Sequence, residues 1–237
     1  MLILATAFGH MQFARAGWFY RYEAYLVTFG AYVASRWLLE STGTISRWIT
    51  TSPSPAATAL AATALALFAL VPVVQRALWA TLSAPRAAAN IHQQQRQVAR
   101  FLKAHYEGAA VALIDVGLAN FEVDLRCLDM AGLADLEVWR EVKAGRWSAD
   151  ALAAMAARRG VVLAVMHQGG WLPYPGRGPP AAWRAMGSWR IPLNVVCAHD
   201  TVTFHAPGPD SRQRLADSLE AFTPHLAPGV VPGEYLR

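Results

Sequence analysis

Residues Pro55 to Val74, PAATALAATALALFALVPVV, decide the fold of the first part of the chain. The stretch has 20 residues and no charge, about the length that a helix needs to cross the hydrocarbon core of a bilayer. Arg47-Trp48 precedes it and Arg76 and Trp79 follow it, so cationic and aromatic anchors flank both ends. The pattern predicts a transmembrane helix near residues 55–75, with a buried helix of a soluble protein as the alternative.

Two further hydrophobic stretches precede this one. Residues 24–39 are apolar until Arg36, whose long side chain can reach a membrane interface. Residues 1–14 carry no charge, are short for a span and lack the basic start and cleavage site of a signal peptide, so we expect a truncated helix. Residues 41–55 are rich in Ser, Thr and Pro and predict a loop. These patterns predict a membrane region over 1–90 with two to three transmembrane helices.

The charge distribution bears on the partners of the chain. The formal net charge is +5 and the isoelectric point is about 9.6, values that would suit a nucleic-acid-binding protein. However, the excess of Arg lies at the ends of the hydrophobic stretches, where Arg contacts lipid headgroups. We therefore expect membrane lipid as a partner and no nucleic acid.

Residues 91–237 have the pattern of a soluble α/β domain. Apolar runs bounded by Gly and polar residues predict strands, and periodic apolar residues after capping residues predict helices. The predicted strands are 109–114, 125–130, 161–166 and an antiparallel pair of 189–197 with 201–205, and the predicted helices are Asn90 to Tyr106, Ser148 to Arg159 and Pro209 to Leu226. This alternation predicts an α/β layered domain with a mixed sheet. No glycine-rich nucleotide-binding motif follows a strand, so we expect no cofactor.

Two carboxylates stand out in this domain. Asp115 follows the first predicted strand and Asp129 ends the second, and α/β proteins bind ligands at the carboxyl ends of parallel strands. Each Asp could equally cap the turn that follows it. Both alternatives remain open at this point.

Other reactive residues of the domain carry less information. His167, His199 and Asp200 lack the spacing of a zinc site and no nucleophile elbow accompanies them, so we interpret them as turn residues and expect no metal. Cys127 and Cys197 both lie in predicted strands. They could be reduced core residues or, if the domain is exported, a disulfide.

Four strings of the sequence are similar to the C-terminal part of bacterial GT-C-type membrane glycosyltransferases. They are Phe19 to Tyr25 (FYRYEAY), Asp115 to Gly117 (DVG), Arg126 to Leu133 (RCLDMAGL) and Asn194 to Val202 (NVVCAHDTV). The resemblance extends from about Gly9 to His205 and includes protein mannosyltransferases and arabinosyltransferases that use polyprenyl-phosphate sugars. It implies transfer of a sugar from a polyprenyl-phosphate donor to an acceptor.

The same resemblance points to individual residues near the start of the chain. Arg21-Tyr22 is similar to an Arg-Tyr element that such enzymes place near the lipid-phosphate donor, with Glu23 as a partner of Arg21 or a second polar contact. The planar guanidinium of Arg suits a phosphate because it makes two parallel charge-assisted hydrogen bonds. The alternative role for Arg21 is anchoring to lipid headgroups.

The family places its catalytic carboxylate in a loop near the N-terminus that has no counterpart here. We therefore expect missing N-terminal transmembrane helices as partners, unknown catalytic residues and an inactive isolated chain. The alternative functions are a membrane-anchored, non-catalytic binding or assembly module and, with the least support, a hydrolase that uses His167 or His199 with Asp200.

The expected location is the inner membrane, with several spans and a periplasmic α/β domain. The resemblance favours this placement. The basic residues between Arg76 and Lys103 argue for the cytoplasm instead.

Overall fold

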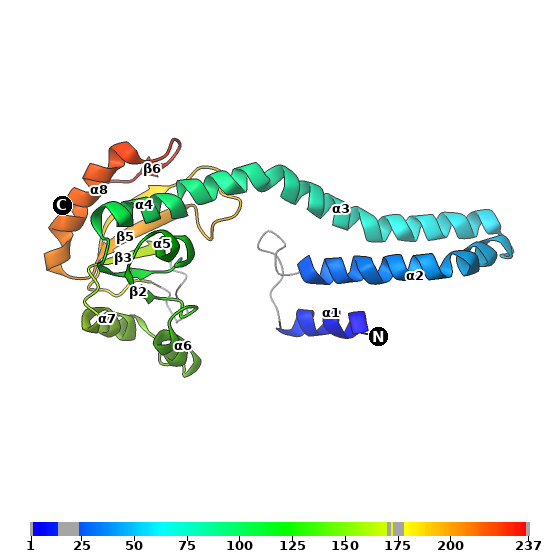
Figure 1. The fold of residues 1–237 in the computed structure, drawn as a ribbon, viewed down its shortest axis with the longest axis horizontal. Helices are drawn as coiled ribbons and strands as arrows, with labels where there is room; N and C mark the ends of the chain where they lie inside the picture. The colour runs from blue at the N-terminus through cyan, green and yellow to red at the C-terminus, as the bar shows by residue number, and fades with distance from the viewer. Residues whose placement is uncertain (1, 14–23, 170–171, 173–177, 236–237) are drawn as a thin grey trace. The chain divides into compact units, whose positions relative to one another are not determined.

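The apolar stretch forms part of one long helix in the computed structural model, which describes residues 2–13, 24–169, 172 and 178–235 (Figure 1). This helix, α3, spans Pro55–Gln93. Its most apolar segment has none of its residues buried. Among the described residues it is the one helix long and apolar enough to cross a membrane. The chain divides into two units, Met1–Ala84 and Pro85–Arg237.

The first unit contains α1 (Leu2–Phe13), α2 (Ala24–Thr50) and the larger part of α3. The prediction of a loop over 41–55 was wrong for most of that range, because α2 continues to Thr50. The hydroxyl of Thr50 donates to the carbonyl of Ser46 at 3.0 Å and that of Thr42 donates to Leu39 at 3.3 Å. Each hydroxyl is thereby satisfied by a carbonyl of the preceding turn, which lets Ser and Thr lie within the helix.

The second unit begins with the last residues of α3, and α4 (Gln95–His105) follows after a break at Gln94. Asn90 is therefore inside α3 and does not begin a helix, contrary to the prediction. Its side chain is fully buried, accepts from the amide of Val195 at 3.0 Å and donates to the carbonyl of Pro192 at 3.4 Å. A tertiary contact, rather than a helix cap, explains the asparagine.

A six-stranded sheet of order β2-β1-β3-β5-β4-β6 forms the centre of this unit. Its strands are β1 (Ala110–Leu113), β2 (Arg126–Asp129), β3 (Leu163–His167), β4 (Arg184–Arg190), β5 (Thr201–Ala206) and β6 (Val231–Pro232). β1 pairs in parallel with β2 and β3, whereas the β3–β5, β4–β5 and β4–β6 pairs are antiparallel. The prediction of an α/β domain with a mixed sheet is confirmed.

The strand predicted over 189–197 lies elsewhere, because β4 ends at Arg190 and the chain then leaves the sheet. Pro192 has no amide to donate to a neighbouring strand, and Leu193 has a φ of 48°. The side-chain carbonyl of Asn194 accepts from the amides of Val196 and Cys197 at 3.1 and 2.8 Å. Residues 191–200 therefore form a loop with its own hydrogen bonds, and Cys197 belongs to that loop.

Helices cover both faces of the sheet, and each face has its own apolar core. Figure 1 shows α4 and α8 (Arg212–Phe222) on one side of the sheet and α6 (Leu136–Lys143) and α7 (Ala149–Arg158) on the other. The first core contains an aromatic cluster in which the ring of Phe101 lies 5.4 Å from those of Trp189 and Phe204. Burying one such side chain stabilises the fold by about 2–3 kcal/mol.

The helices of the domain match the predictions in part. Ser148 caps α7 as predicted, with its hydroxyl accepting from the amide of Ala151 at 3.1 Å. The predicted helix over 209–226 consists of α8 with a short 3-10 helix at each end, Pro209–Ser211 and Thr223–His225. The sequence did not predict α5 (Gly117–Glu122) or α6.

Candidate binding sites

The predicted donor contact of the membrane region lies outside the described residues, since Arg21, Tyr22 and Glu23 fall in that part of the chain. A groove nevertheless begins at the next residue, Ala24. It has a volume of about 290 Å³ and lies between the first turns of α2 and the later part of α3. Its lining consists of the apolar residues Ala24, Val27, Val73, Ala77 and Ala80, with Thr28 and Arg76.

The described lining of this groove is mostly apolar. Thr28 donates its hydroxyl to the carbonyl of Ala24 at 2.9 Å. Among the described residues that line the groove, Arg76 is the one with a charge. Arg76 comes shortly after the uncharged stretch that ends at Val74, where a membrane interface is expected. Apolar walls beside an Arg suit a hydrocarbon chain with an anionic headgroup.

Asp129, the second predicted site residue of the α/β domain, is buried at the end of β2. Its two carboxylate oxygens accept from the amides of Ala131 at 2.9 Å and Ala134 at 2.5 Å. The carboxylate therefore caps the turn between β2 and α6, which is the alternative role that the sequence left open.

Asp115 lies just beyond β1, at the carboxyl edge of the parallel strands, and its side chain is exposed. Oδ2 of Asp115 accepts from the amide of Gln95 at 3.1 Å. The other end of the Gln95 side chain, Oε1, accepts from the thiol of Cys197 at 3.5 Å. Gln95 thus links the end of β1 with the loop before β5.

His167 ends β3 beside this link and is almost fully buried. Its Nδ1 has no hydrogen-bond partner among the described residues. Burial lowers the pKa of His167, Asp115 opposes that change and His199 adds to it. The imidazole is therefore neutral near pH 7, and its Nδ1 is shielded from solvent.

His199 and Asp200 complete what we call the carboxyl-edge cluster, which consists of Gln95, Asp115, His167, Cys197, His199 and Asp200. Nδ1 of His199 lies 2.9 Å from Oδ1 of Asp200, a contact that becomes an ion pair when the imidazole is protonated. The carbonyl of His199 accepts from the side chain of Gln94 at 2.9 Å. The cluster combines carboxylates, side-chain amides and a neutral imidazole, so it contains both hydrogen-bond donors and acceptors.

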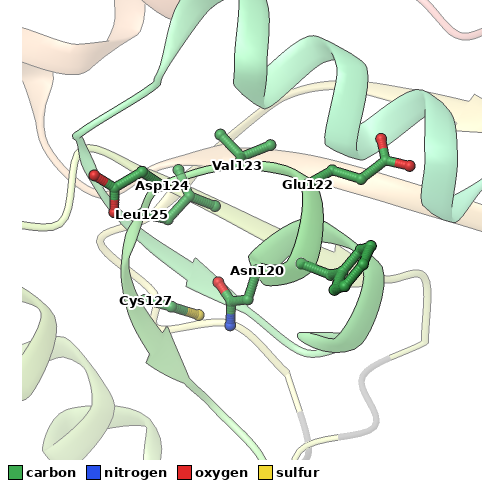
Figure 2. Close-up of a pocket in the computed structure, with 7 residues that line it drawn as sticks. Asn120, Glu122, Val123, Asp124, Leu125 and Cys127 are labelled. Carbon is green, nitrogen blue, oxygen red and sulfur yellow. The ribbon is translucent and has the colours of Figure 1, made fainter.

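A second pocket of the α/β domain, of about 460 Å³, lies between α5 and the start of β2. Figure 2 shows the side chain of Asn120 beside the sulfur of Cys127, with Glu122 and Asp124 pointing away from them. Glu122 pairs with Arg96 of α4 at 3.8 Å. Burial raises the pKa of the Cys127 thiol, so this sulfur is mostly protonated and a poor nucleophile at pH 7.

Neither cysteine has the features of a reactive nucleophile or a disulfide in this structure. Cys127 and Cys197 are both free thiols, so the structure agrees with reduced cysteines and not with the disulfide. Burial raises the pKa of Cys197 to about 11. Within the described ranges, no group of three or more His, Cys, Asp or Glu residues is arranged to hold a metal ion.

Sequence reasoning found Asp115 but missed the glutamines that connect it to the rest of the cluster. Gln94 and Gln95 lie in a run of glutamines that looks like an ordinary polar helix surface. Only the break between α3 and α4 turns both side chains toward the 191–200 loop.

Comparison with known proteins finds one family model over part of this domain and gives it no function. Residues 89–205 match a family model described as a domain of unknown function, DUF8728. The match extends from the end of α3 into β5 and contains the whole carboxyl-edge cluster. No curated protein matches the chain, and no solved structure does.

Proposed function

We propose that the chain is a membrane-anchored part of a GT-C-like glycosyltransferase, in which the α/β domain holds the acceptor or shapes the entrance for a polyprenyl-phosphate sugar donor. The observation that carries the proposal is α3, whose apolar side chains are exposed along a length that fits a bilayer. A soluble protein would leave this surface in water at a large cost in free energy.

The groove beside Ala24 supports the donor side of the proposal. It directly follows Arg21-Tyr22-Glu23 in the sequence, the element that resembles a lipid-phosphate contact. The groove offers apolar walls for a polyprenyl chain, and Arg76 offers a cation for its phosphate.

The carboxyl-edge cluster supports the acceptor side. The carboxylates of Asp115 and Asp200 and the side-chain amide of Gln95 match the hydroxyl groups of a sugar or a hydroxyl-bearing acceptor. The resemblance assigns the catalytic carboxylate of such enzymes to a region without a counterpart among the similar strings. In this proposal, further membrane helices supply it.

We place the protein in the inner membrane with several spans, α1 and α2 included, and with the α/β domain in the periplasm. The resemblance supports this orientation. The basic residues after the long span oppose it, although long domains cross membranes largely regardless of charge.

The proposal is tested by donor binding to the full chain in lipid nanodiscs, with radiolabelled polyprenyl-phosphate mannose and polyprenyl-phosphate arabinose as probes. We expect saturable binding of one of them, and a loss of about tenfold in affinity for Arg21→Ala, since one charge-assisted contact contributes about 1.4 kcal/mol or more. Arg47→Ala is the matched control, because this Arg lies at the opposite end of α2. No saturable binding of either probe would contradict the donor role.

A second candidate is a membrane-anchored binding or assembly module without transfer chemistry. Two observations favour it. The carboxylate of Asp129 caps a turn, and burial raises the pKa of both thiols. This candidate predicts that the chain partitions into membranes but binds neither donor probe.

A further inference from the structure

An exposed apolar surface lies on the α/β domain, at the turn after β2 and along α6. Leu133 in the turn is 86% exposed, and Leu136 and Trp139 on the helix are 58% and 47% exposed. The two helical residues are three positions apart and therefore share one face of α6. We call Leu133, Leu136, Trp139, Arg140 and Lys143 the α6 face.

The structure holds Leu133 in the exposed position. The buried carboxylate of Asp129 fixes the turn through the amides of Ala131 and Ala134. Gly132 adopts a φ of 74°, and a Cβ at this position would lie 2.8 Å from the amide nitrogen of Trp139. Only glycine fits this approach, so the turn packs tightly against α6 and directs Leu133 into solvent.

The charges of α6 are divided between its two flanks. Glu137 pairs with Arg158 and Arg159, and Glu141 pairs with Arg146 at 2.7 Å. Arg140 and Lys143 have no carboxylate partner among the described residues, and the ammonium of Lys143 lies 5.9 Å from the ring centre of Trp139. The apolar residues of the α6 face therefore lie beside two basic residues that no described carboxylate pairs with.

We infer that the α6 face docks on an anionic lipid surface. Leucine and tryptophan side chains enter the interfacial layer of a bilayer, and adjacent Lys and Arg contact anionic headgroups. The inference rests on the proposed membrane anchoring, because a domain tethered by α3 meets this surface at high local concentration. The positive charges of Arg140 and Lys143 match anionic headgroups, and this favours a bilayer over an apolar protein partner.

Fluorescence of a label at the exposed turn tests the inference on the full chain in nanodiscs. Cys127 and Cys197 are replaced by alanine, Leu133→Cys carries an environment-sensitive NBD label, and the discs contain phosphatidylcholine with or without phosphatidylglycerol. Lipids with a doxyl quencher near the headgroup report direct contact of the label with the bilayer. Asp217→Cys on α8 is the matched control, because its exposed position lies on the opposite side of the sheet.

We expect a blue-shifted emission and strong doxyl quenching at position 133 in anionic discs, with neither effect at position 217. Arg140→Gln with Lys143→Gln is expected to reduce the quenching at least about twofold, because each basic residue adds attraction to an anionic surface. A label at 133 that stays in water in anionic discs would overturn the inference, and so would a shielded label that doxyl lipids do not quench, which would indicate a protein contact. Both of these results leave the chain in the disc, so they differ from a failure of the proposed anchoring, in which the chain would not enter discs at all.

Discussion

At the scale of single residues, the polar groups of the α/β domain differ in burial and in the number of their partners inside the protein. Asp129 uses both carboxylate oxygens inside the protein, whereas Asp115 is exposed and gives one oxygen to Gln95. His167 is buried with a free ring nitrogen. The two carboxylates that look alike in the sequence therefore differ in what they can bind.

Replacement of Asp129 by alanine tests its role in the turn. We expect Asp129→Ala to lower the free energy of unfolding by about 2–4 kcal/mol, because two backbone amides lose a charged acceptor in a buried position. The melting temperature in detergent micelles measures the effect, with the exposed Asp124→Ala as control. Equal melting temperatures for both variants would contradict the role of the carboxylate.

His205 of β5 makes the stability of the domain depend on pH. Burial lowers its pKa from 6.5 to about 4. Between these values the unfolded chain binds a proton that the folded protein does not, so the free energy of unfolding falls as the pH drops, by about 1.4 kcal/mol per pH unit at most. Above pH 6.5 this histidine has no effect.

We therefore expect His205→Gln to lose less stability than the unmodified protein between pH 6.5 and pH 4.5. Chemical denaturation in micelles at several pH values measures the slope. His225→Gln, on the exposed surface, is the control and should keep the original slope. An unchanged slope for His205→Gln would show that the side chain is protonated in the folded protein.

At the scale of elements, one carboxylate joins α6 to α7. Asp135 caps α6 by accepting from the amides of Glu137 and Val138 at 3.1 and 3.3 Å, and it pairs with Arg159 at the end of α7. Burial opposes the charge of Asp135, but Arg159 and the two amides lower the pKa of the carboxyl overall. The helix that carries the α6 face is thereby fixed to its neighbour.

Two substitutions of Asp135 separate the cap from the ion pair. Asp135→Asn keeps a cap acceptor and removes the charge, so we expect a loss of about 1 kcal/mol or less, as for other partly exposed pairs. Asp135→Ala removes the cap as well, and we expect a total loss of about 1–3 kcal/mol. Thermal unfolding in micelles measures both. A result in which the two variants lose the same stability would assign the whole effect to the ion pair.

At the scale of the whole molecule, the two units differ in how far their apolar side chains are buried. In the first unit the large apolar side chains of α3 are exposed, whereas the second unit buries its apolar residues on both faces of a sheet. α3 is long and apolar enough to cross a bilayer, and in the proposed function a bilayer covers its exposed apolar side chains.

Charges placed in the middle of α3 test the membrane assignment. We expect Leu65→Lys with Leu67→Lys to reduce several-fold the protein that remains in carbonate-washed membranes, since each lysine costs about 2.5–3.5 kcal/mol at the centre of a bilayer. Leu65→Ala with Leu67→Ala keeps the segment apolar and is the control. If the lysine variant stayed in the membrane like the alanine variant, or if the unmodified protein remained monodisperse without detergent, α3 would not be a span.

The sequence predicted most of the buried strands, but it predicted neither the contacts of the carboxyl-edge cluster nor the α6 face. Apolar runs such as 161–166 identify buried strands because the local pattern alone decides their burial. Gln95 and Cys197 are 102 positions apart, and α6 follows a turn that depends on one glycine and one buried carboxylate. No local periodicity reports such contacts.

The sequence by itself determined the apolar span, the α/β character of the domain and the mixed sheet, because length, charge and periodicity act on neighbouring residues. Only the tertiary structure decided that Asn90 and Cys197 belong to a helix interior and a loop, that Asp129 caps a turn while Asp115 joins a cluster, and that Leu133 is exposed. The physical reason is that these features depend on hydrogen bonds and packing between segments far apart in the chain. Such interactions form only when the segments meet in the folded protein, so no single segment predicts them.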